Sequence, residues 1–157
     1  KMNKTILVVE DDENDLMFVK MAMKKAGVTN PVQVAHDGQA ALDYFQGAGK
    51  FADRSAFPLP YLVLLDLKLP YVMGLEVLAW IRDRPQFKQT IVIMLTSSRH
   101  TEDIGTAYQM GANAYLVKPA NLVALEGMMK TLKDFWLTQN TPPPDCGKWA
   151  VSETAKS

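Results

Sequence analysis

Short apolar segments alternate with longer amphipathic segments along most of the chain. The apolar segments are rich in β-branched residues and contain few polar positions, which is typical of strands buried on both faces of a parallel sheet. The segments between them repeat apolar residues at helical spacing, as Leu16, Val19 and Met23 do in the first. We therefore expect five strands, at residues 5–10, 31–35, 61–66, 90–95 and 114–117, each followed by a helix, at residues 13–27, 38–47, 74–83, 101–111 and 121–137.

This alternation predicts an α/β fold, a doubly wound five-stranded parallel sheet with helices on both faces. Two segments lie outside the pattern. Residues 47–60 are punctuated by glycine and proline and predict a long loop. Near the end of the chain, the prolines at 142–144 must end any helix and favour an extended arm. We expect a domain over residues 4–139, followed by a proline-containing tail, residues 140–157, and no output domain.

Composition excludes several classes of protein. Of 157 residues, 48 % are hydrophobic, and seventeen basic residues balance seventeen acidic ones, so no charge excess is available to hold nucleic acid. No apolar run approaches the roughly 20 residues that cross a bilayer. The amino terminus lacks the apolar core of a signal peptide, and the single cysteine, Cys146, cannot form an intrachain disulfide. We expect a cytoplasmic protein that binds neither nucleic acid nor membrane.

Polar side chains follow four of the predicted strands. The carboxyl ends of parallel strands meet at one edge of the sheet, where such folds bind ligands. The residues at these ends are Glu10, Asp11 and Asp12 after the first strand, Asp66 after the third, Thr96, Ser97 and Ser98 after the fourth, and Lys118 with Pro119 after the fifth. Crowded carboxylates need a cation, and Mg²⁺ prefers one or two carboxylates together with water and phosphate oxygens. A carboxylate beside such an ion can act as a nucleophile toward a phosphoryl group.

This chemistry predicts a role for three of these residues. Asp66 is the candidate nucleophile, and Lys118 and Thr96 supply a positive charge and a hydrogen bond to the phosphoryl oxygens. Each residue has a simpler interpretation when taken alone. The segment EDDEND is typical of a helix start, where carboxylates favour the positive end of the helix dipole, and Asp66 could cap a turn.

The segments ILVVEDD, LLDLKLPYVMGLEVL, MLTSS and GANAYLVKP resemble, in this order, the receiver domain of two-component response regulators, over about residues 4–137. The resemblance implies a flavodoxin-like (βα)5 fold with strand order 2-1-3-4-5. It implies that Asp66 is the phosphoacceptor and that Thr96 supplies the hydroxyl that moves toward the phosphoryl group. Lys118 is implied as the base that forms a salt bridge at this site. Tyr115 is implied as the switch aromatic, and the peptide bond between Lys118 and Pro119 as cis.

The same resemblance implies a Mg²⁺ site. Glu10 and Asp11 match the acidic pair of the family and are expected to bind the ion together with Asp66 and the backbone carbonyl of Lys68. Asp12 lies one position beyond this pair, and its contribution stays open. Three segments resemble more narrowly the stand-alone regulators that serve phytochrome-type and related sensor histidine kinases: residues 47–60, TAYQMGANAYLVKP and DFWLTQNTPPP.

The resemblance implies phosphorelay signalling with a sensor histidine kinase, and with a downstream protein or a phosphotransfer partner, rather than an enzyme that acts on other molecules. A phosphatase with an aspartate nucleophile, of the haloacid-dehalogenase type, is a weaker alternative, because it needs a second acid where Lys68 stands. A receiver-like scaffold that works unphosphorylated is another alternative. A flavin carrier is disfavoured because the acidic segment after the first strand would repel its phosphate.

The last predicted helix raises the question of a homodimer. Its apolar residues, near helical spacing, are Leu122, Leu125, Met129, Leu132 and Trp136. They could form a dimer interface together with the tail, or they could simply cover the sheet.

Overall fold

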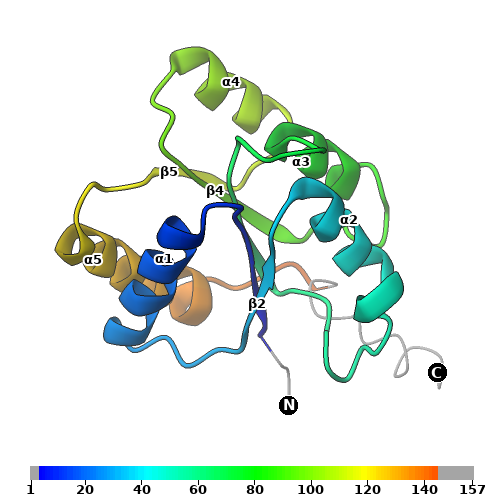
Figure 1. The fold of residues 1–157 in the computed structure, drawn as a ribbon, viewed down its shortest axis with the longest axis horizontal. Helices are drawn as coiled ribbons and strands as arrows, with labels where there is room; N and C mark the ends of the chain where they lie inside the picture. The colour runs from blue at the N-terminus through cyan, green and yellow to red at the C-terminus, as the bar shows by residue number, and fades with distance from the viewer. Residues whose placement is uncertain (1–3, 145–157) are drawn as a thin grey trace.

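The strands and helices follow one another as the sequence predicts (Figure 1). The structure, a computed structural model, describes residues 4–144. Each predicted strand and helix overlaps one of these elements. The elements are β1 (Ile6–Val9), α1 (Glu13–Lys25), β2 (Val32–Ala35), α2 (Gly38–Gln46), the 3₁₀-helix η1 (Gly49–Phe51), β3 (Leu62–Leu65), α3 (Gly74–Arg82), β4 (Ile91–Thr96), α4 (Thr101–Gln109), β5 (Ala114–Val117), α5 (Leu122–Leu132) and the π-helix η2 (Lys133–Gln139).

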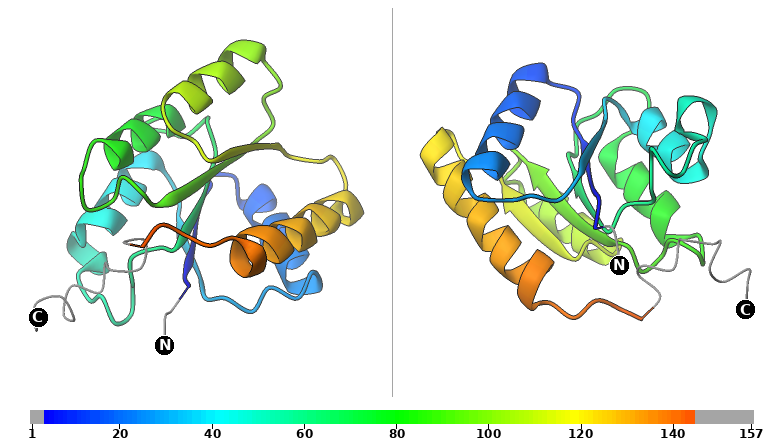
Figure 2. Two further views of the ribbon diagram at one scale, coloured as in Figure 1. Left: turned by 180° about the vertical axis from the view of Figure 1, so that it is seen from behind. Right: turned by 90° about the horizontal axis from the view of Figure 1, so that it is seen from below.

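The strands form one parallel sheet in the order β2-β1-β3-β4-β5. Helices α1 and α5 pack side by side on one face, and α2, α3 and α4 cover the other (Figure 2). The doubly wound α/β fold and the strand order 2-1-3-4-5 are therefore confirmed. None of the helices in the described part of the chain is long and apolar enough to span a bilayer.

Residues of β1 point alternately into the two cores. Ile6 and Val8 belong to the core beneath α1 and α5, whereas Leu7 and Val9 belong to the core beneath α2, α3 and α4. All four are at most 2 % exposed. This explains why the strand shows no alternation of polar and apolar residues, since each face of the sheet must bury side chains.

Side-chain caps mark where α1 and α5 begin. The carboxylate of Asp12 accepts a hydrogen bond of 2.9 Å from the backbone N–H of Asp15, and the amide oxygen of Asn121 accepts one of 2.8 Å from Ala124. Such caps stabilise a helix by about 1 kcal/mol. The interpretation of the acidic segment as a helix start is therefore right for Asp12.

Residues 47–60 contain more structure than the predicted loop. They include η1, and Phe51 is buried with its ring centroid 5.0 Å from that of Tyr44 and 5.2 Å from that of Phe57. The Arg54 guanidinium donates hydrogen bonds of 2.6 Å and 3.0 Å to the carbonyls of Phe45 and Phe57. The sequence does not predict these contacts, because they depend on how the side chains of residues 44–57 pack together and not on a periodic pattern.

The single helix predicted over residues 121–137 is divided in the structure. The α-helical pattern ends at Leu132, and a π-helix continues to Gln139, where the backbone N–H of Asn140 donates a hydrogen bond of 2.6 Å to the Phe135 carbonyl. The wider turn of the π-helix shifts the side chains that follow it relative to an α-helix. The prediction of one continuous α-helix is therefore wrong in its last turns. Of the predicted tail, residues 145–157 lie outside the described residues.

The apolar face of α5 is internal. Leu125, Met129 and Leu132 are buried in the core shared with α1, and Leu122 and Trp136 pack, half-buried, against the same core. This face covers the sheet, so the five residues predicted for a dimer interface are occupied within the chain.

Candidate functional site

The polar residues predicted at the strand ends meet at one edge of the sheet. Glu10 directly follows β1, Asp66 follows β3, Thr96 ends β4 and Lys118 follows β5. Glu10, Asp66 and Thr96 are buried, with 4 %, 8 % and 2 % of their surfaces exposed. Parallel pairing fixes their backbones, because the N–H of Asp66 bonds to the carbonyl of Val9 at 3.2 Å and that of Lys118 to the carbonyl of Thr96 at 2.8 Å.

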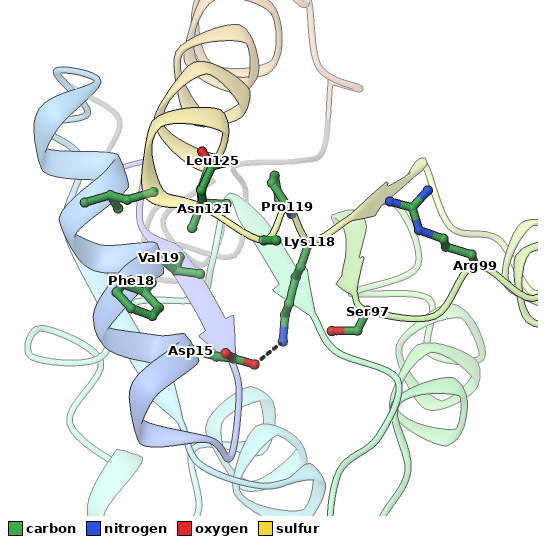
Figure 3. Close-up of a pocket in the computed structure, with 11 residues that line it drawn as sticks. Asp15, Phe18, Val19, Ser97, Arg99, Lys118, Pro119, Asn121 and Leu125 are labelled. Carbon is green, nitrogen blue, oxygen red and sulfur yellow. Dashed lines mark hydrogen bonds and ion pairs between the residues drawn. The ribbon is translucent and has the colours of Figure 1, made fainter.

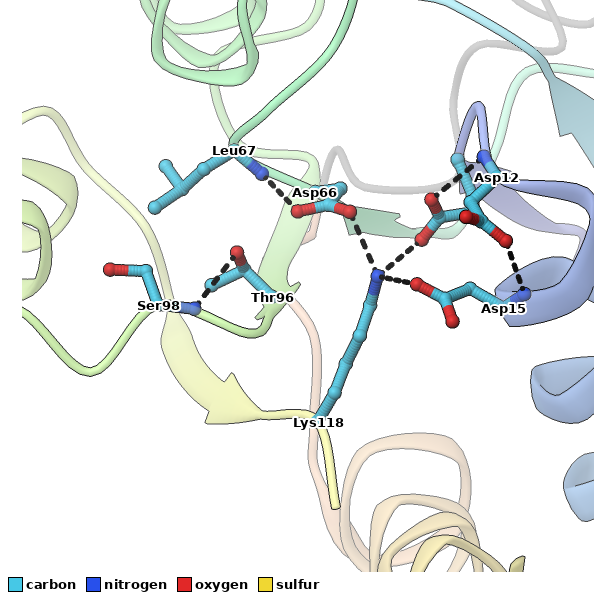
Figure 4. A network of polar contacts seen from close by, with 8 residues as sticks. Asp12, Asp15, Asp66, Leu67, Thr96, Ser98 and Lys118 are labelled. Atoms are coloured by element: carbon cyan, nitrogen blue, oxygen red, sulfur yellow. Dashed lines mark hydrogen bonds and ion pairs between the residues drawn. The ribbon is translucent and has the colours of Figure 1, made fainter. Parts of the chain in front are cut away.

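The ammonium group of Lys118 lies among three carboxylates (Figure 4). Its Nζ donates hydrogen bonds to Glu10 Oε1 at 2.5 Å, to Asp66 Oδ2 at 2.8 Å and to Asp15 Oδ2 at 3.0 Å. An ammonium group has three N–H donors, so these bonds satisfy all of them. Sequence reasoning missed Asp15; the only available signal was its position in the first turn of the helix that follows the acidic pair.

Burial and charge shift the protonation of this cluster. Burial raises the pKa of Glu10 to about 7, against the opposing effect of its hydrogen bond to Lys118, and the nearby charge of Asp66 adds to the rise. Burial alone would lower the pKa of Lys118, but its hydrogen bonds to Asp66 and Glu10 outweigh burial and hold that pKa above its ordinary value. Lys118 is therefore a permanent cation at neutral pH, whereas Glu10 titrates there.

The expectation of a cis peptide between Lys118 and Pro119 is wrong. Residues 4–144 contain no cis peptide bond. The trans form is the more stable one by about 0.5–1 kcal/mol for a bond before proline. In this trans geometry the Lys118 side chain still reaches Asp66, Glu10 and Asp15.

The backbone around Asp66 is tightly fixed. The second carboxylate oxygen of Asp66, Oδ1, accepts a hydrogen bond of 2.7 Å from the backbone N–H of Leu67. The first residue of α3, Gly74, donates its N–H to the Leu67 carbonyl at 2.9 Å. A Cβ atom on Gly74 would lie 2.0 Å from the carbonyl oxygen of Asp66, so only glycine fits at this close approach.

Hydrogen bonds link Thr96 to the predicted switch aromatic through Ser98. The N–H of Ser98 donates to Thr96 Oγ1 at 3.4 Å, and the Tyr115 hydroxyl donates to the Ser98 carbonyl at 3.0 Å. The Ser98 hydroxyl in turn donates to Asp103 in the first turn of α4 at 2.5 Å. The segment that leaves β4 therefore contacts both β5 and α4.

A cavity of about 560 Å³ opens over this edge of the sheet. Its lining includes Glu10, Asp66, Thr96 and Lys118, together with Asp11, Asp12, Asp15, Lys68, Ser97, Ser98, Arg99 and His100. Asp11 and Lys68 are exposed at this cavity, while Asp12 is engaged in capping α1. A second cavity, of about 400 Å³, lies beside the first and extends between α1 and residues 118–125 (Figure 3). The two cavities share Asp15, Ser97, Arg99 and Lys118.

The predicted Mg²⁺ ligands agree in part with this geometry. No three His, Cys, Asp or Glu side chains within residues 4–144 are grouped as metal ligands. Glu10 and Asp66 nevertheless direct carboxylate oxygens at one cation, the Lys118 ammonium. Two carboxylates beside an open cavity fit the needs of Mg²⁺, which takes one or two carboxylates and completes its shell with water and phosphate oxygens. The donor set therefore fits the ion in kind and number.

Together, the fold and this edge of the sheet define the class of protein. Residues 6–130 match the response regulator receiver domain family, and the chain belongs to that family. It is thus a signalling domain of two-component systems, a family in which phosphorylation and Mg²⁺ binding are characteristic.

Within the family, the chain is similar to response regulators associated with phytochromes. It is 36 % identical to response regulator Rcp1 of Synechocystis, over 89 % of this chain and 93 % of Rcp1. The crystal structure of the phosphorylated cyanobacterial phytochrome response regulator RcpA superposes with a TM-score of 0.82, at 35 % identity, over 90 % of this chain and 99 % of RcpA. The solved structure of the bacteriophytochrome response regulator RtBRR superposes with a TM-score of 0.73, at 41 % identity, over 99 % of this chain and 93 % of RtBRR.

Proposed function

We propose that this chain is a stand-alone response regulator, with its receiver domain at residues 4–139, that accepts a phosphoryl group on Asp66 from a sensor histidine kinase in the cytoplasm. The observation that supports this best is the meeting of Asp66 with Lys118, 2.8 Å apart, at the carboxyl edge of the sheet. A carboxylate held beside a fixed ammonium group suits phosphoryl transfer, which depends on positioning and charge neutralisation.

In the proposed reaction, a carboxylate oxygen of Asp66 bonds to phosphorus while the bond from phosphorus to the donor nitrogen of a phosphohistidine breaks. That nitrogen keeps the electron pair. The Lys118 ammonium and the Thr96 hydroxyl donate hydrogen bonds to the phosphoryl oxygens, and both line the cavity above Asp66. Asp66, Thr96 and Lys118 lie at the ends of neighbouring strands, so the sheet holds their backbones close to one another before the reaction.

The reaction is proposed to depend on Mg²⁺. Glu10, Asp11 and Asp66 would hold the ion through carboxylates, and Lys68 through its backbone carbonyl. When bound, the ion supplies positive charge to the phosphoryl oxygens. Rcp1, which is similar to this chain, has a crystal structure in an Mn²⁺-bound form, at 36 % identity and a TM-score of 0.79. This supports a divalent cation site in the present chain.

Phosphorylation is proposed to change a protein-binding surface formed by α4, β5 and α5. Thr96 would move toward the phosphoryl group, and Tyr115 would follow it inward. The existing hydrogen bonds from Ser98 N–H to Thr96 and from the Tyr115 hydroxyl to the Ser98 carbonyl support such coupling, because a movement of residues 96–98 must alter the Tyr115 contact. The two states must differ by only a few kcal/mol for such a switch.

The names of the similar proteins support a phytochrome-type kinase as the partner that supplies the phosphoryl group. The output would then be contact with a downstream protein, onward phosphotransfer, or formation of a homodimer. A homodimer would have to use surfaces other than the buried face of α5 described above.

Intact mass spectrometry tests the proposed acceptor. The chain is incubated with acetyl phosphate, with Mg²⁺ or with a chelator, and the Asp66→Asn variant is treated in parallel. We expect the wild type to gain the mass of one phosphoryl group only with Mg²⁺, and the variant to gain none. An equal gain in the variant would show that another residue accepts the group.

Hydrogen–deuterium exchange tests the proposed switch. In the wild type, phosphorylation should change exchange in α4 and β5. In Thr96→Ala, the phosphoryl group should still be gained, but exchange in these elements should stay at its unphosphorylated level. The same change in the variant as in the wild type would refute the coupling through Thr96.

A further inference from the structure

Asp15 is the third acceptor of the Lys118 ammonium, and the proposed reaction assigns it no role. Its Oδ2 lies 3.0 Å from Lys118 Nζ, and its side chain is 41 % exposed, compared with 5 % for Glu10 and 10 % for Asp66. It comes from the first turn of α1, whereas Glu10 and Asp66 come from strand ends. Asp15 also lines both cavities on this edge of the sheet (Figure 3).

Local hydrogen bonds leave the Asp15 carboxylate free to face Lys118. A residue at this position of a helix, three after the cap, often turns its side chain back to the N–H of the capping residue. Here the cap is Asp12, and its N–H donates instead to Glu10 Oε2 at 3.1 Å. The backbone N–H of Asp15 donates to the Asp12 carboxylate, which fixes the turn. The acidic segment thus satisfies its own backbone without the Asp15 side chain (Figure 4).

The proposed function changes the surroundings of the ammonium group in a definite way. A phosphoryl group on Asp66 and a divalent cation at Glu10 and Asp66 would occupy carboxylate oxygens that now accept hydrogen bonds from Lys118. Of the present partners, only Asp15 would remain. The ammonium must still point at the phosphoryl oxygens, and a lysine side chain with four rotatable bonds needs a second anchor to hold one direction.

We propose that Asp15 is a positioning residue that holds the Lys118 ammonium beside the phosphoacceptor once the other carboxylates are occupied. This inference rests on the proposed phosphorylation of Asp66. Asp15 does not itself contact the phosphoryl group; it acts through Lys118.

Three variants in the first turn of α1 separate this role from a general effect of charge. Asp15→Asn removes the carboxylate charge at nearly constant shape, and Asp15→Glu restores a carboxylate. Glu13→Gln is the matched control, because Glu13 lies in the same helical turn but is 80 % exposed, and its Oε2 lies 3.8 Å from His36 Nδ1. The control removes one negative charge from the same end of α1.

The first readout is the rate of phosphorylation by acetyl phosphate at saturating Mg²⁺ and saturating donor. We expect Asp15→Asn to lower this maximal rate by about 10-fold, because loss of a residue that orients a functional group commonly costs 10- to 100-fold. Asp15→Glu should recover part of the rate, and Glu13→Gln should match the wild type. If Asp15 merely attracted the cation, saturating Mg²⁺ would restore the rate of Asp15→Asn, and the inference would be overturned.

The second readout does not depend on phosphorylation. The reactivity of Lys118 toward acetic anhydride is measured by peptide mass spectrometry with Mg²⁺ present and no phosphodonor. Lys118 should label faster in Asp15→Asn than in the wild type or Glu13→Gln, and equal labelling together with an unchanged maximal rate would also overturn the inference. If the wild type gains no phosphoryl group on Asp66, the proposed function itself fails. The comparison of the intact masses of the wild type and Asp66→Asn detects this failure separately.

Discussion

The close approach of Gly74 to the backbone of Asp66 gives a quantitative prediction. In Gly74→Ala, the new Cβ would lie 2.0 Å from the Asp66 carbonyl oxygen and 2.8 Å from the Cα of Leu67. Ordinary contact begins at 3.4 Å, so α3 and the end of β3 must separate by about 1.4 Å at the closest point. Both contacts are to backbone atoms, which cannot rotate away as a flexible side chain would.

We expect two effects of this separation. Overpacking of this kind costs about 1 to 3 kcal/mol, and the better helix propensity of alanine returns at most about 1 kcal/mol, so the free energy of unfolding should fall by about 1 to 2 kcal/mol. The movement also displaces Asp66 from Lys118. A misplacement of about 1 Å can cost about 100-fold in rate, so phosphorylation by acetyl phosphate should slow far more than stability alone explains.

Urea unfolding and the rate of phosphoryl gain, measured by intact mass, test this prediction. Gly127→Ala in α5 is the matched control, because its added Cβ would meet no atom within 4 Å other than its chain neighbours and the nearby backbone of its own helix. The free energy of unfolding of that variant should rise by about 0.5 to 1 kcal/mol, and the variant should be phosphorylated at the wild-type rate. If Gly74→Ala unfolds at the same urea concentration as the wild type and is phosphorylated as fast, Gly74 does not hold Asp66 in place.

Two further predictions follow from the Lys118 cluster. Lys118→Met leaves the buried carboxylates of Glu10 and Asp66 without their cation. The free energy of unfolding should fall by about 3 kcal/mol at pH 8, and by less at pH 6, where Glu10 takes up a proton. Equal stability of variant and wild type in urea at pH 8 would contradict this prediction. The second concerns Glu10, whose pKa is about 7 in the folded chain, compared with 4.5 ordinarily. Between these values the native state keeps a proton that the unfolded state has released, so ionisation of Glu10 lowers the free energy of unfolding as pH rises from about 4.5 to about 7. Glu10→Gln should therefore gain stability relative to the wild type by about 1 to 3 kcal/mol across this window, with no further gain above it; a constant difference at all pH values would refute the shifted pKa.

Most of the fold could be predicted because the central strands β1, β3 and β4 are buried on both faces. Strands such as β1 and β4 are apolar throughout, and each amphipathic segment between strands has a periodicity of its own. The end of α5 could not be predicted, since the π-helix that follows it has only 7 residues, too few for its apolar pattern to be told from that of an α-helix. The contacts of Arg54 with the carbonyls of residues 45 and 57 could not be predicted either, because they depend on the path of an irregular segment that has no periodic pattern.

The site could be predicted where its residues lie at strand ends. Glu10, Asp66 and Lys118 follow buried strands, and the parallel order of the strands brings them together. Asp15 and Gly74 belong to helix starts instead, and their importance depends on distances of 3.0 Å and 2.0 Å that no sequence spacing specifies. Asp11, although predicted as a ligand, is exposed beside the cavity in this structure.

The proposed signalling function depends on Asp66 as the phosphoacceptor. Borohydride reduces the acyl phosphate of an aspartate to homoserine, which leaves a permanent mark at the modified position. After incubation with acetyl phosphate and Mg²⁺, then borohydride and proteolysis, peptide mass spectrometry should find homoserine at position 66 and at no other acidic residue. Homoserine at Asp11 or Asp15, 5-hydroxynorvaline (the reduction product of a glutamyl phosphate) at Glu10, or an unmodified position 66 in a chain that has gained a phosphoryl group would contradict this assignment.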